Sequence, residues 1–141
     1  MGETRANYPH FHRIETRWAD NDVYGHVNNA TYYALLDTVV NRFLLDRGLL
    51  DLERSPSFGV VVETGCKYMK SLSFPDRIDA GLRVAKLGNS SVRYELALFR
   101  AGDEDPAATA TFVHVYVDRA TRRPVPIPSE VRAALEPLQR R

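Results

Sequence analysis

The residues best suited to chemistry lie in an irregular stretch that leads directly into a helical pattern. Asp20, Asp22 and Gly25 precede the pair Asn28 and Asn29, and none of these residue types extends a strand or helix cleanly. Either asparagine can cap the following helix by accepting a hydrogen bond from a first-turn amide. The pattern therefore places a carboxylate beside unpaired N–H groups at the positive end of a helix dipole. Such a carboxylate can attack a carbonyl carbon or deprotonate a water, while the N–H groups stabilise charge on the carbonyl oxygen.

Each of these residues also has a purely structural interpretation. Asp22 could close an Asx-type turn before the helix, and Asp20 is expected to accept loop-stabilising hydrogen bonds rather than act as a second catalyst. Asn28 and Asn29 are capping residues first, and any substrate contact would be additional. His26 either holds the loop through hydrogen bonds or transfers protons near Asp22, and the structural role is favoured.

Composition excludes several function classes. The 141 residues carry 19 Lys and Arg against 18 Asp and Glu, a net charge of +1 that gives no reason to expect nucleic acid or an anionic membrane as the main partner. The single cysteine, Cys66, excludes an internal disulfide and fits a reducing compartment. The N-terminus leads into no apolar signal segment, so a cytoplasmic protein is expected. His10 and His12 share a strand face without a carboxylate or cysteine cluster, so we expect no metal.

Hydrophobic periodicity predicts one helix followed by a run of strands. Apolar residues at helical spacing predict a buried helix over residues 29 to 47, ended by a left-handed cap at Gly48. Alternation predicts strands over residues 10 to 18, 58 to 70, 78 to 87, 91 to 100 and 107 to 118. Ile14 and Trp18 are expected to face inward, and Ser129 to cap a short final helix.

Together these elements predict a single α+β domain over residues 1–141, with residues 1–9 as a loose arm. Short links between the last four strands predict an antiparallel meander. One five-stranded sheet wrapped around one long, central, buried helix is the economical packing.

The irregular stretch resembles a known signature. The run Trp18-x-Asp20-x-Asp22-x-x-Gly25-His26-Val27-Asn28-Asn29-x-x-Tyr32 is similar to the active-site motif of hot-dog-fold acyl-CoA thioesterases. The resemblance is closest to the 4-hydroxybenzoyl-CoA thioesterase-like branch, which includes bacterial long-chain acyl-CoA thioesterases. It extends over residues 11 to 138, because the later strands and the proline-rich end also match.

The resemblance implies a mechanism and a set of site residues. Asp22 would act on the thioester, and helix N-terminal amides, best represented by that of Asn29, would polarise its carbonyl, with His26 nearby. Glu63 and Thr64 would begin a strand that crosses to the neighbouring subunit's site, and three lysines would clamp coenzyme A phosphates. The full set of substrate-binding candidates is Tyr24, Gly25, Val27, Asn28, Tyr32, Glu63, Thr64, Lys67, Lys70 and Lys86.

The resemblance also implies a homodimer or homotetramer with substrate at the subunit interface, and no cofactor beyond the coenzyme A of the substrate. A fatty-acyl or an aromatic-acyl thioester would be hydrolysed to a free acid. Two alternatives stay open: an acyl-CoA-binding protein without turnover, and a hydratase or dehydratase on the same fold. The second ranks lower, because Asn21 precedes Asp22 and Val23 follows it, unlike the usual hydratase motif.

Overall fold

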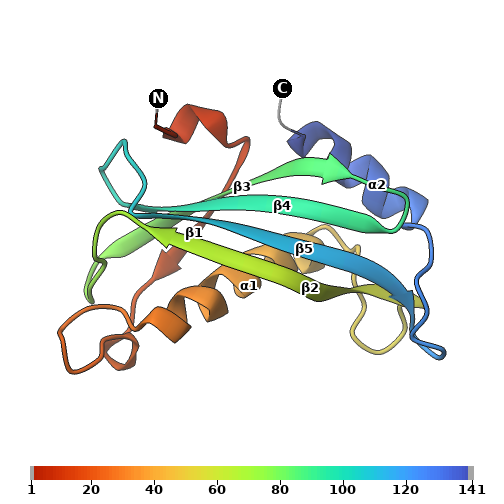
Figure 1. Ribbon diagram of the computed structural model, residues 1–141, viewed down its shortest axis with the longest axis horizontal. Helices are drawn as coiled ribbons and strands as arrows, with labels where there is room; N and C mark the ends of the chain where they lie inside the picture. Colours follow the sequence, from red (N-terminus) through yellow and green to blue (C-terminus); the bar gives the residue numbers. More distant parts are fainter. Residues whose placement is uncertain (1, 140–141) are drawn as a thin grey trace.

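The computed structural model describes residues 2–139, which form one sheet and two helices that pack into one hydrophobic core on its inner face. Figure 1 shows α1 behind the strands and the shorter α2 at the β3 edge of the sheet. The elements are a 3-10 turn Arg5–Asn7, β1 His10–Glu15, a 3-10 turn Trp18–Asp20, α1 Asn29–Asp46, β2 Ser57–Tyr68, β3 Arg77–Leu87, β4 Ser91–Arg100, β5 Ala108–Asp118, α2 Ser129–Leu135 and a 3-10 turn Glu136–Leu138.

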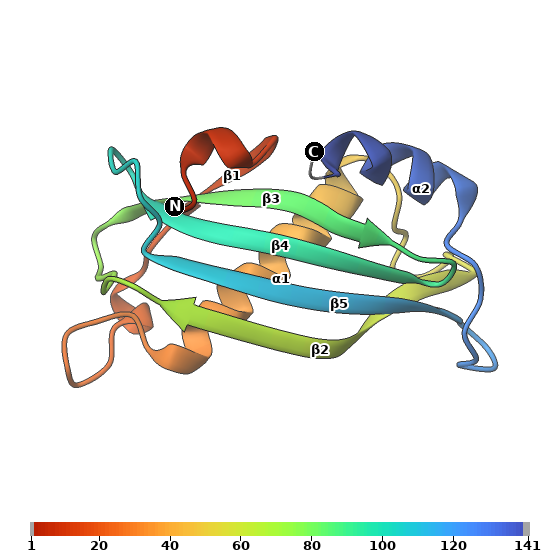
Figure 2. The same ribbon diagram turned by 45° about the horizontal axis from the view of Figure 1, so that its top comes forward.

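The strands of residues 2–139 form a five-stranded antiparallel sheet in the order β1-β3-β4-β5-β2. The expected five-stranded antiparallel sheet is therefore confirmed, but the expected meander of four strands is wrong for its first member. Only β3, β4 and β5 follow one another as neighbours, whereas β2 pairs with β5 at the far edge. The segment between β2 and β3 must therefore cross one end of the sheet, as Figure 2 shows.

Helix α1 has 18 residues and is closed at both ends as its sequence predicts. The side chain of Asn28 accepts from the N–H of Ala30 at 2.9 Å, which caps the first turn. Gly48 adopts a φ of 68°, a left-handed conformation that glycine reaches without a Cβ penalty. Ser129, by contrast, is the first residue of α2 and makes no capping hydrogen bond.

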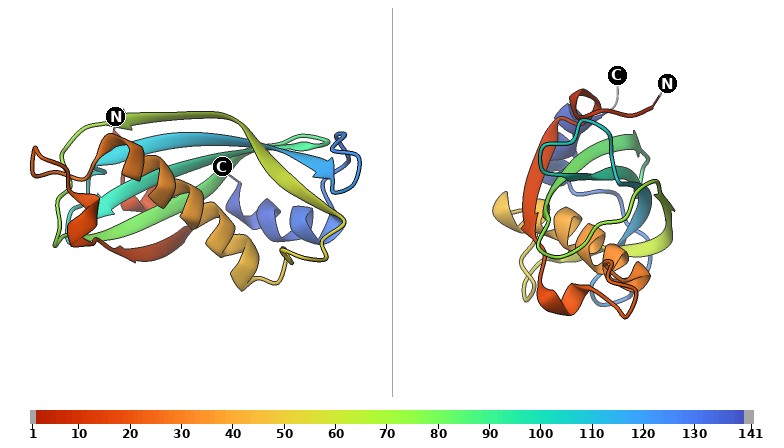
Figure 3. Two further views of the ribbon diagram at one scale, coloured as in Figure 1. Left: turned by 90° about the horizontal axis from the view of Figure 1, so that it is seen from below. Right: turned by 90° about the vertical axis from the view of Figure 1, so that its left-hand side faces the viewer.

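One face of α1 is buried against the sheet and another is open in this chain. Leu36, Val40 and Phe43 are buried in the core, while Ala34, Asp37 and Thr38 are exposed. The view from below in Figure 3 shows α1 running diagonally across the sheet. Within the described residues the sheet therefore covers one side of the helix rather than enclosing it.

The core lies between α1 and the inner face of the sheet. Alternate residues of each central strand point inward, which is the pattern of a sheet with one covered face. The buried inward residues are Ile78, Ala80, Leu82 and Val84 of β3, Val92, Tyr94, Leu96 and Leu98 of β4, and Ala108, Ala110, Phe112, His114 and Tyr116 of β5.

The N-terminal segment differs from the expected loose arm because charged side chains fasten it to the outer face of the sheet. Arg83 of β3 is nearly inaccessible and pairs with Glu3 at 2.6 Å and with Glu95 at 2.8 Å. Arg5 pairs with Asp79 at 2.9 Å. Buried and half-buried charged side chains such as these have partners because an unpaired charge would be costly to desolvate.

The first strand is shorter than expected and ends before the motif. It stops at Glu15, and Trp18 lies in a 3-10 turn with 79% of its surface exposed, so the expectation that Trp18 faces inward is wrong. The indole instead contacts the ring of Phe74 edge-on, with the centroids 6.0 Å apart.

None of the helices among residues 2–139 is long and apolar enough to cross a membrane.

Candidate active site

The loop before α1 is held by backbone hydrogen bonds to two neighbouring segments. The N–H of Val27 donates to Leu72 O at 2.7 Å, in the segment that crosses from β2 to β3. The N–H of Asn28 donates to Asp20 O at 2.9 Å, and Asn21 and Val27 form an antiparallel bridge. The irregular sequence thus folds into a closed loop that is tied down at its exit into the helix.

Asp22 closes the turn at the tip of this loop. One carboxylate oxygen accepts from the N–H of Tyr24 at 2.9 Å, which is an Asx turn, and the other accepts from Nδ2 of Asn28 at 3.2 Å. The side chain is half-buried. Since a carboxylate has about four lone-pair sites, these two hydrogen bonds leave capacity for a water or a substrate.

Asp20 differs from Asp22 in its burial and its partners, and only 1% of its surface is exposed. It accepts from the backbone N–H of Arg17 at 2.7 Å and from the Arg17 guanidinium at 2.8 Å. Burial alone would raise the pKa of Asp20, but the hydrogen bonds and charge of Arg17 outweigh burial and lower it. Both interactions fix the base of the loop.

Within residues 2–139, the first turn of α1 offers one N–H group without an acceptor. The N–H of Ala30 is taken by the Asn28 side chain, and the N–H of Thr31 donates to Asn28 O at 2.9 Å. The backbone N–H of Asn29 donates to no acceptor among residues 2–139. This group carries the positive end of the helix dipole and can receive a developing negative charge.

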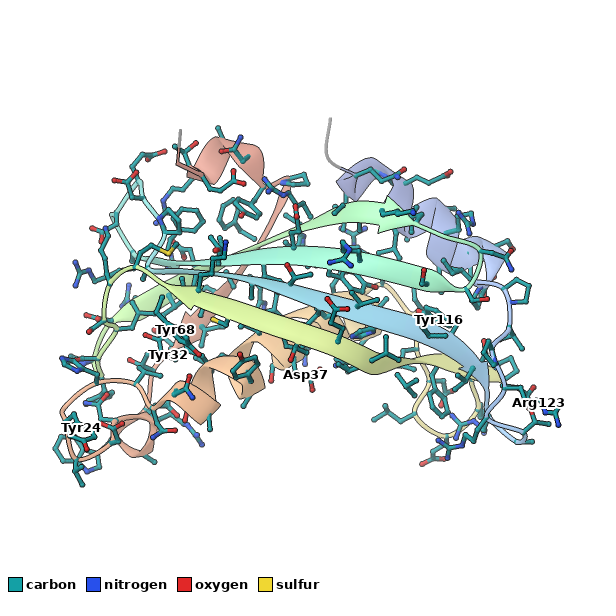
Figure 4. The ribbon with its side chains drawn as sticks, in the orientation of Figure 1. Tyr24, Tyr32, Asp37, Tyr68, Tyr116 and Arg123 are labelled. Carbon is teal, nitrogen blue, oxygen red and sulfur yellow. The ribbon has the colours of Figure 1, made fainter. Side chains whose placement is uncertain are left out.

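A cavity of about 360 Å³ lies beside this N–H group. Figure 4 shows that Tyr32 and Tyr68 lie side by side here, between the start of α1 and the end of β2. The cavity brings together five of the residues expected from the sequence with three others. Its lining residues are His26, Val27, Asn29, Tyr32, Tyr68, Met69, Lys70 and Ser71.

Tyr68 is a site residue that the sequence reasoning missed. Its hydroxyl donates a hydrogen bond to Oδ1 of Asn29, and its ring meets that of Tyr32 edge-on with centroids 4.9 Å apart. Burial, together with the neighbouring Cys66 and Tyr33, raises the pKa of Tyr68 well above its ordinary value, so the hydroxyl keeps its proton. The alternation that puts Cys66 on the inner face also puts Tyr68 there, and this is the signal that could have identified it.

Other expected site residues lie outside this cavity. Tyr24 is 81% exposed at the loop tip, as Figure 4 shows, and Gly25 beside it has a φ of 81°. Asn28 does not line the cavity; it caps α1 and donates a hydrogen bond to Asp22. Glu63 and Thr64 lie on the exposed edge strand β2.

The three candidate lysines do not cluster. Lys70 lines the cavity, and its ammonium group lies 3.4 Å from the carboxylate of Asp103. Lys67 instead lines a cavity on the outer face with Arg83. Lys86 is exposed on β3, opposite Arg93 in the register, and does not line the 360 Å³ cavity.

Comparison with known proteins relates the chain to thioesterases. The sequence profile of the thioesterase-like superfamily matches residues 16–135. The PA5185 protein from Pseudomonas aeruginosa strain PAO1 is 55% identical, with 97% of this chain and 96% of that protein covered and a TM-score of 0.94. The PA2801 protein from the same species is 31% identical over 90% of this chain and 98% of that one, with a TM-score of 0.84. Slr0204, a 1,4-dihydroxy-2-naphthoyl-CoA thioesterase from Synechocystis, is similar in fold alone, at 16% identity over 89% of this chain and 93% of that one and a TM-score of 0.80.

Proposed function

The chain belongs to the thioesterase-like superfamily, and we propose on that basis that it is an acyl-CoA thioesterase, which releases a free acid and coenzyme A. Its antiparallel sheet with one 18-residue helix is consistent with the hot-dog fold. Fold similarity alone does not define a reaction, so the proposal rests on the loop and the helix start.

One observation carries the proposal: the Asp22 carboxylate, which does not itself line the cavity, is hydrogen-bonded to the residue directly before an amide that has no acceptor among residues 2–139. Asp22 is bonded to Asn28 at 3.2 Å, and the adjacent residue, Asn29, presents its backbone N–H beside the cavity. Thioester hydrolysis needs such a pair, because negative charge develops on the carbonyl oxygen as a nucleophile attacks the carbonyl carbon. The Asn29 amide would receive that charge, and Asp22 would supply or activate the nucleophile.

Two routes fit this arrangement. Asp22 can attack the carbonyl carbon, expel the coenzyme A thiolate and leave a mixed anhydride, which a water then cleaves. Alternatively, Asp22 takes a proton from a water that attacks directly, and the thiolate leaves with the acid as the other product. A single turnover in H₂¹⁸O distinguishes them, because only the first route leaves heavy oxygen in the Asp22 carboxylate when the anhydride is opened at the protein side.

The walls of the cavity suggest how the acyl group is held. Tyr32, Tyr68 and Met69 are broad, weakly polar surfaces that suit a fatty or an aromatic acyl group. Lys70 is the candidate phosphate contact at this cavity, although it would have to exchange its Asp103 partner.

We further propose that the active form is a homodimer or homotetramer, as the family resemblance implies. The edge strand β2 supports this proposal, because Val61 and Val62 are 45% and 58% exposed. An edge strand with unpaired backbone groups and exposed apolar residues favours pairing with another chain.

The test is thiol release from short, long and aromatic acyl-CoA thioesters by wild type and by Asp22→Asn. Loss of turnover in Asp22→Asn with unchanged melting temperature would support the proposal and define the acyl preference. Asp51→Asn is the matched control, since Asp51 also closes an Asx turn, with Glu53 N–H at 2.9 Å, at the other end of α1.

Other results would contradict parts of the proposal. Full turnover by Asp22→Asn would assign the chemistry to another carboxylate. Tight binding of acyl-CoA without thiol release by wild type would favour the acyl-CoA-binding alternative. Hydration of an enoyl-CoA, without thiol release, would favour the hydratase.

A further inference from the structure

Two consecutive asparagines at the start of α1 are held in opposite ways. The side chain of Asn28 folds onto the helix and takes the N–H of Ala30. The side chain of Asn29 turns to β2, where its Oδ1 accepts from the hydroxyl of Tyr68. The two carboxamides are identical in chemistry but have different partners. These partners determine which backbone N–H groups of the first helical turn stay without an acceptor.

An unrestrained Asn29 side chain would compete for the N–H groups beside it. Asparagine side chains readily hydrogen-bond to nearby backbone groups, and Asn28 shows this behaviour one residue earlier. If the Asn29 carbonyl oxygen turned to its own backbone N–H, it would occupy the position that a thioester oxygen has to take. Among residues 2–139, the hydrogen bond from Tyr68 satisfies Oδ1, and neither the backbone N–H nor Nδ2 of Asn29 has an acceptor.

We propose that Tyr68 is a positioning residue, which holds the Asn29 carboxamide by Oδ1 so that the backbone N–H and Nδ2 of Asn29 both stay available to the thioester carbonyl. This inference rests on the proposed function. It names a residue on β2, 39 positions away in the chain, as the one that prepares the helix start for charge on the substrate oxygen.

The surroundings of Tyr68 suit this role. Its ring packs edge-on against Tyr32, which is buried and whose hydroxyl accepts from the N–H of Leu72 at 3.3 Å. Leu72 also accepts from Val27 at 2.7 Å, at the exit of the Asp22 loop. Tyr68 is therefore located relative to the loop through Tyr32 and Leu72, and its hydroxyl meets Asn29 at a defined place.

The first test compares Tyr68→Phe with wild type on the acyl-CoA that wild type hydrolyses fastest. Because the donors of Asn29 act on charge that exists in the transition state, kcat should fall by roughly 10- to 100-fold while KM changes by less than about threefold. Tyr116→Phe is the matched control: it removes a hydroxyl from the same sheet face, Tyr116 does not line the cavity, and Figure 4 shows it far from Tyr32 and Tyr68. It should keep wild-type kcat.

A double-mutant cycle with Asn29→Ala separates positioning from direct contact. If Tyr68 acts through the Asn29 side chain, Tyr68→Phe should change kcat by less than twofold once that side chain is removed. A full 10- to 100-fold loss in the Asn29→Ala background would overturn the inference, because it would mean that the hydroxyl acts on the substrate itself. Unchanged kcat in Tyr68→Phe would overturn it as well.

A readout without turnover keeps the inference separate from the proposed function. In wild type, the Asn29 side-chain amide should give two well-dispersed NMR signals, which in Tyr68→Phe should move toward the positions of a free asparagine. Asn29 signals that do not change would overturn the inference, whether or not the protein is a hydrolase. Absence of thiol release by wild type would contradict only the proposed function.

Discussion

The Asn28 side chain joins the helix to the carboxylate: its Oδ1 lies 2.9 Å from the N–H of Ala30, and its Nδ2 lies 3.2 Å from Oδ2 of Asp22. One carboxamide thus caps α1 and orients Asp22. A cap made by serine or aspartate would stabilise the helix about as well but would present no N–H donor to Asp22.

Substitutions of Asn28 should therefore separate stability from activity. Asn28→Ser keeps a good capping oxygen, so the free energy of unfolding should change by less than about 0.5 kcal/mol, while kcat falls because Asp22 loses its N–H donor. Asn28→Ala should lose both functions and about 1 kcal/mol. Urea unfolding and thiol release measured on both variants check this, and equal kcat for Asn28→Ser and wild type would refute the link to Asp22.

The two glycines of β2 should respond differently to alanine. A Cβ at Gly59 would lie 2.9 Å from Nδ1 of His114, which is buried and cannot move aside, whereas a Cβ at Gly65 would meet nothing within 4 Å. Gly59→Ala should therefore lower the free energy of unfolding by about 1–3 kcal/mol. Gly65→Ala should raise it by up to about 1 kcal/mol through loss of unfolded-state entropy. Urea unfolding measures both, and similar values for the two variants would contradict the close packing at Gly59.

His114 should make stability depend on pH. It is 2% exposed, neither ring nitrogen has a hydrogen-bond partner among residues 2–139, and burial lowers its pKa although the charge of Asp37 opposes this. The folded state then binds fewer protons than the unfolded state, so this contribution is complete above about pH 6.5 and is lost as the pH falls. His114→Phe should flatten the dependence of the free energy of unfolding on pH between 8 and 5.

A remaining slope in His114→Phe is expected from His10. Its pKa is also lowered, first by burial and then by the charges of Arg47 and His12. A slope in His114→Phe equal to that of wild type would show that the buried imidazole does not control acid sensitivity.

Local patterns in the sequence were sufficient for α1, for the positions of the central strands and for an asparagine cap at the start of the helix. These features depend on neighbours within a few residues, so periodicity and capping chemistry report them. Trp18 was placed wrongly because the alternation of residues 10 to 15 was extended through it, while Asp20 and Arg17 fold that segment into a turn.

The rest depended on contacts between distant segments. Nothing near β2 in the sequence shows that it pairs with β5, which decides that Tyr68 faces Asn29 and that Lys67 and Lys70 lie on different sides of the sheet. The N-terminal segment was also unpredictable, because Glu3 and Arg83 are 80 positions apart. Contacts between residues this far apart in the chain follow from the topology of the sheet, and local sequence propensities do not encode that topology.

The pairing of β2 with β5 also determines when the site can form during synthesis. Tyr68 takes its place through its register opposite Ala108, so it cannot be held beside Asn29 until β5 has left the ribosome. Until then β2 is present without the strand that joins it to the sheet, and its apolar residues have no permanent cover. The cavity at the start of the helix is thus among the last parts of the molecule to be completed, although most of its residues are made in the first half of the chain.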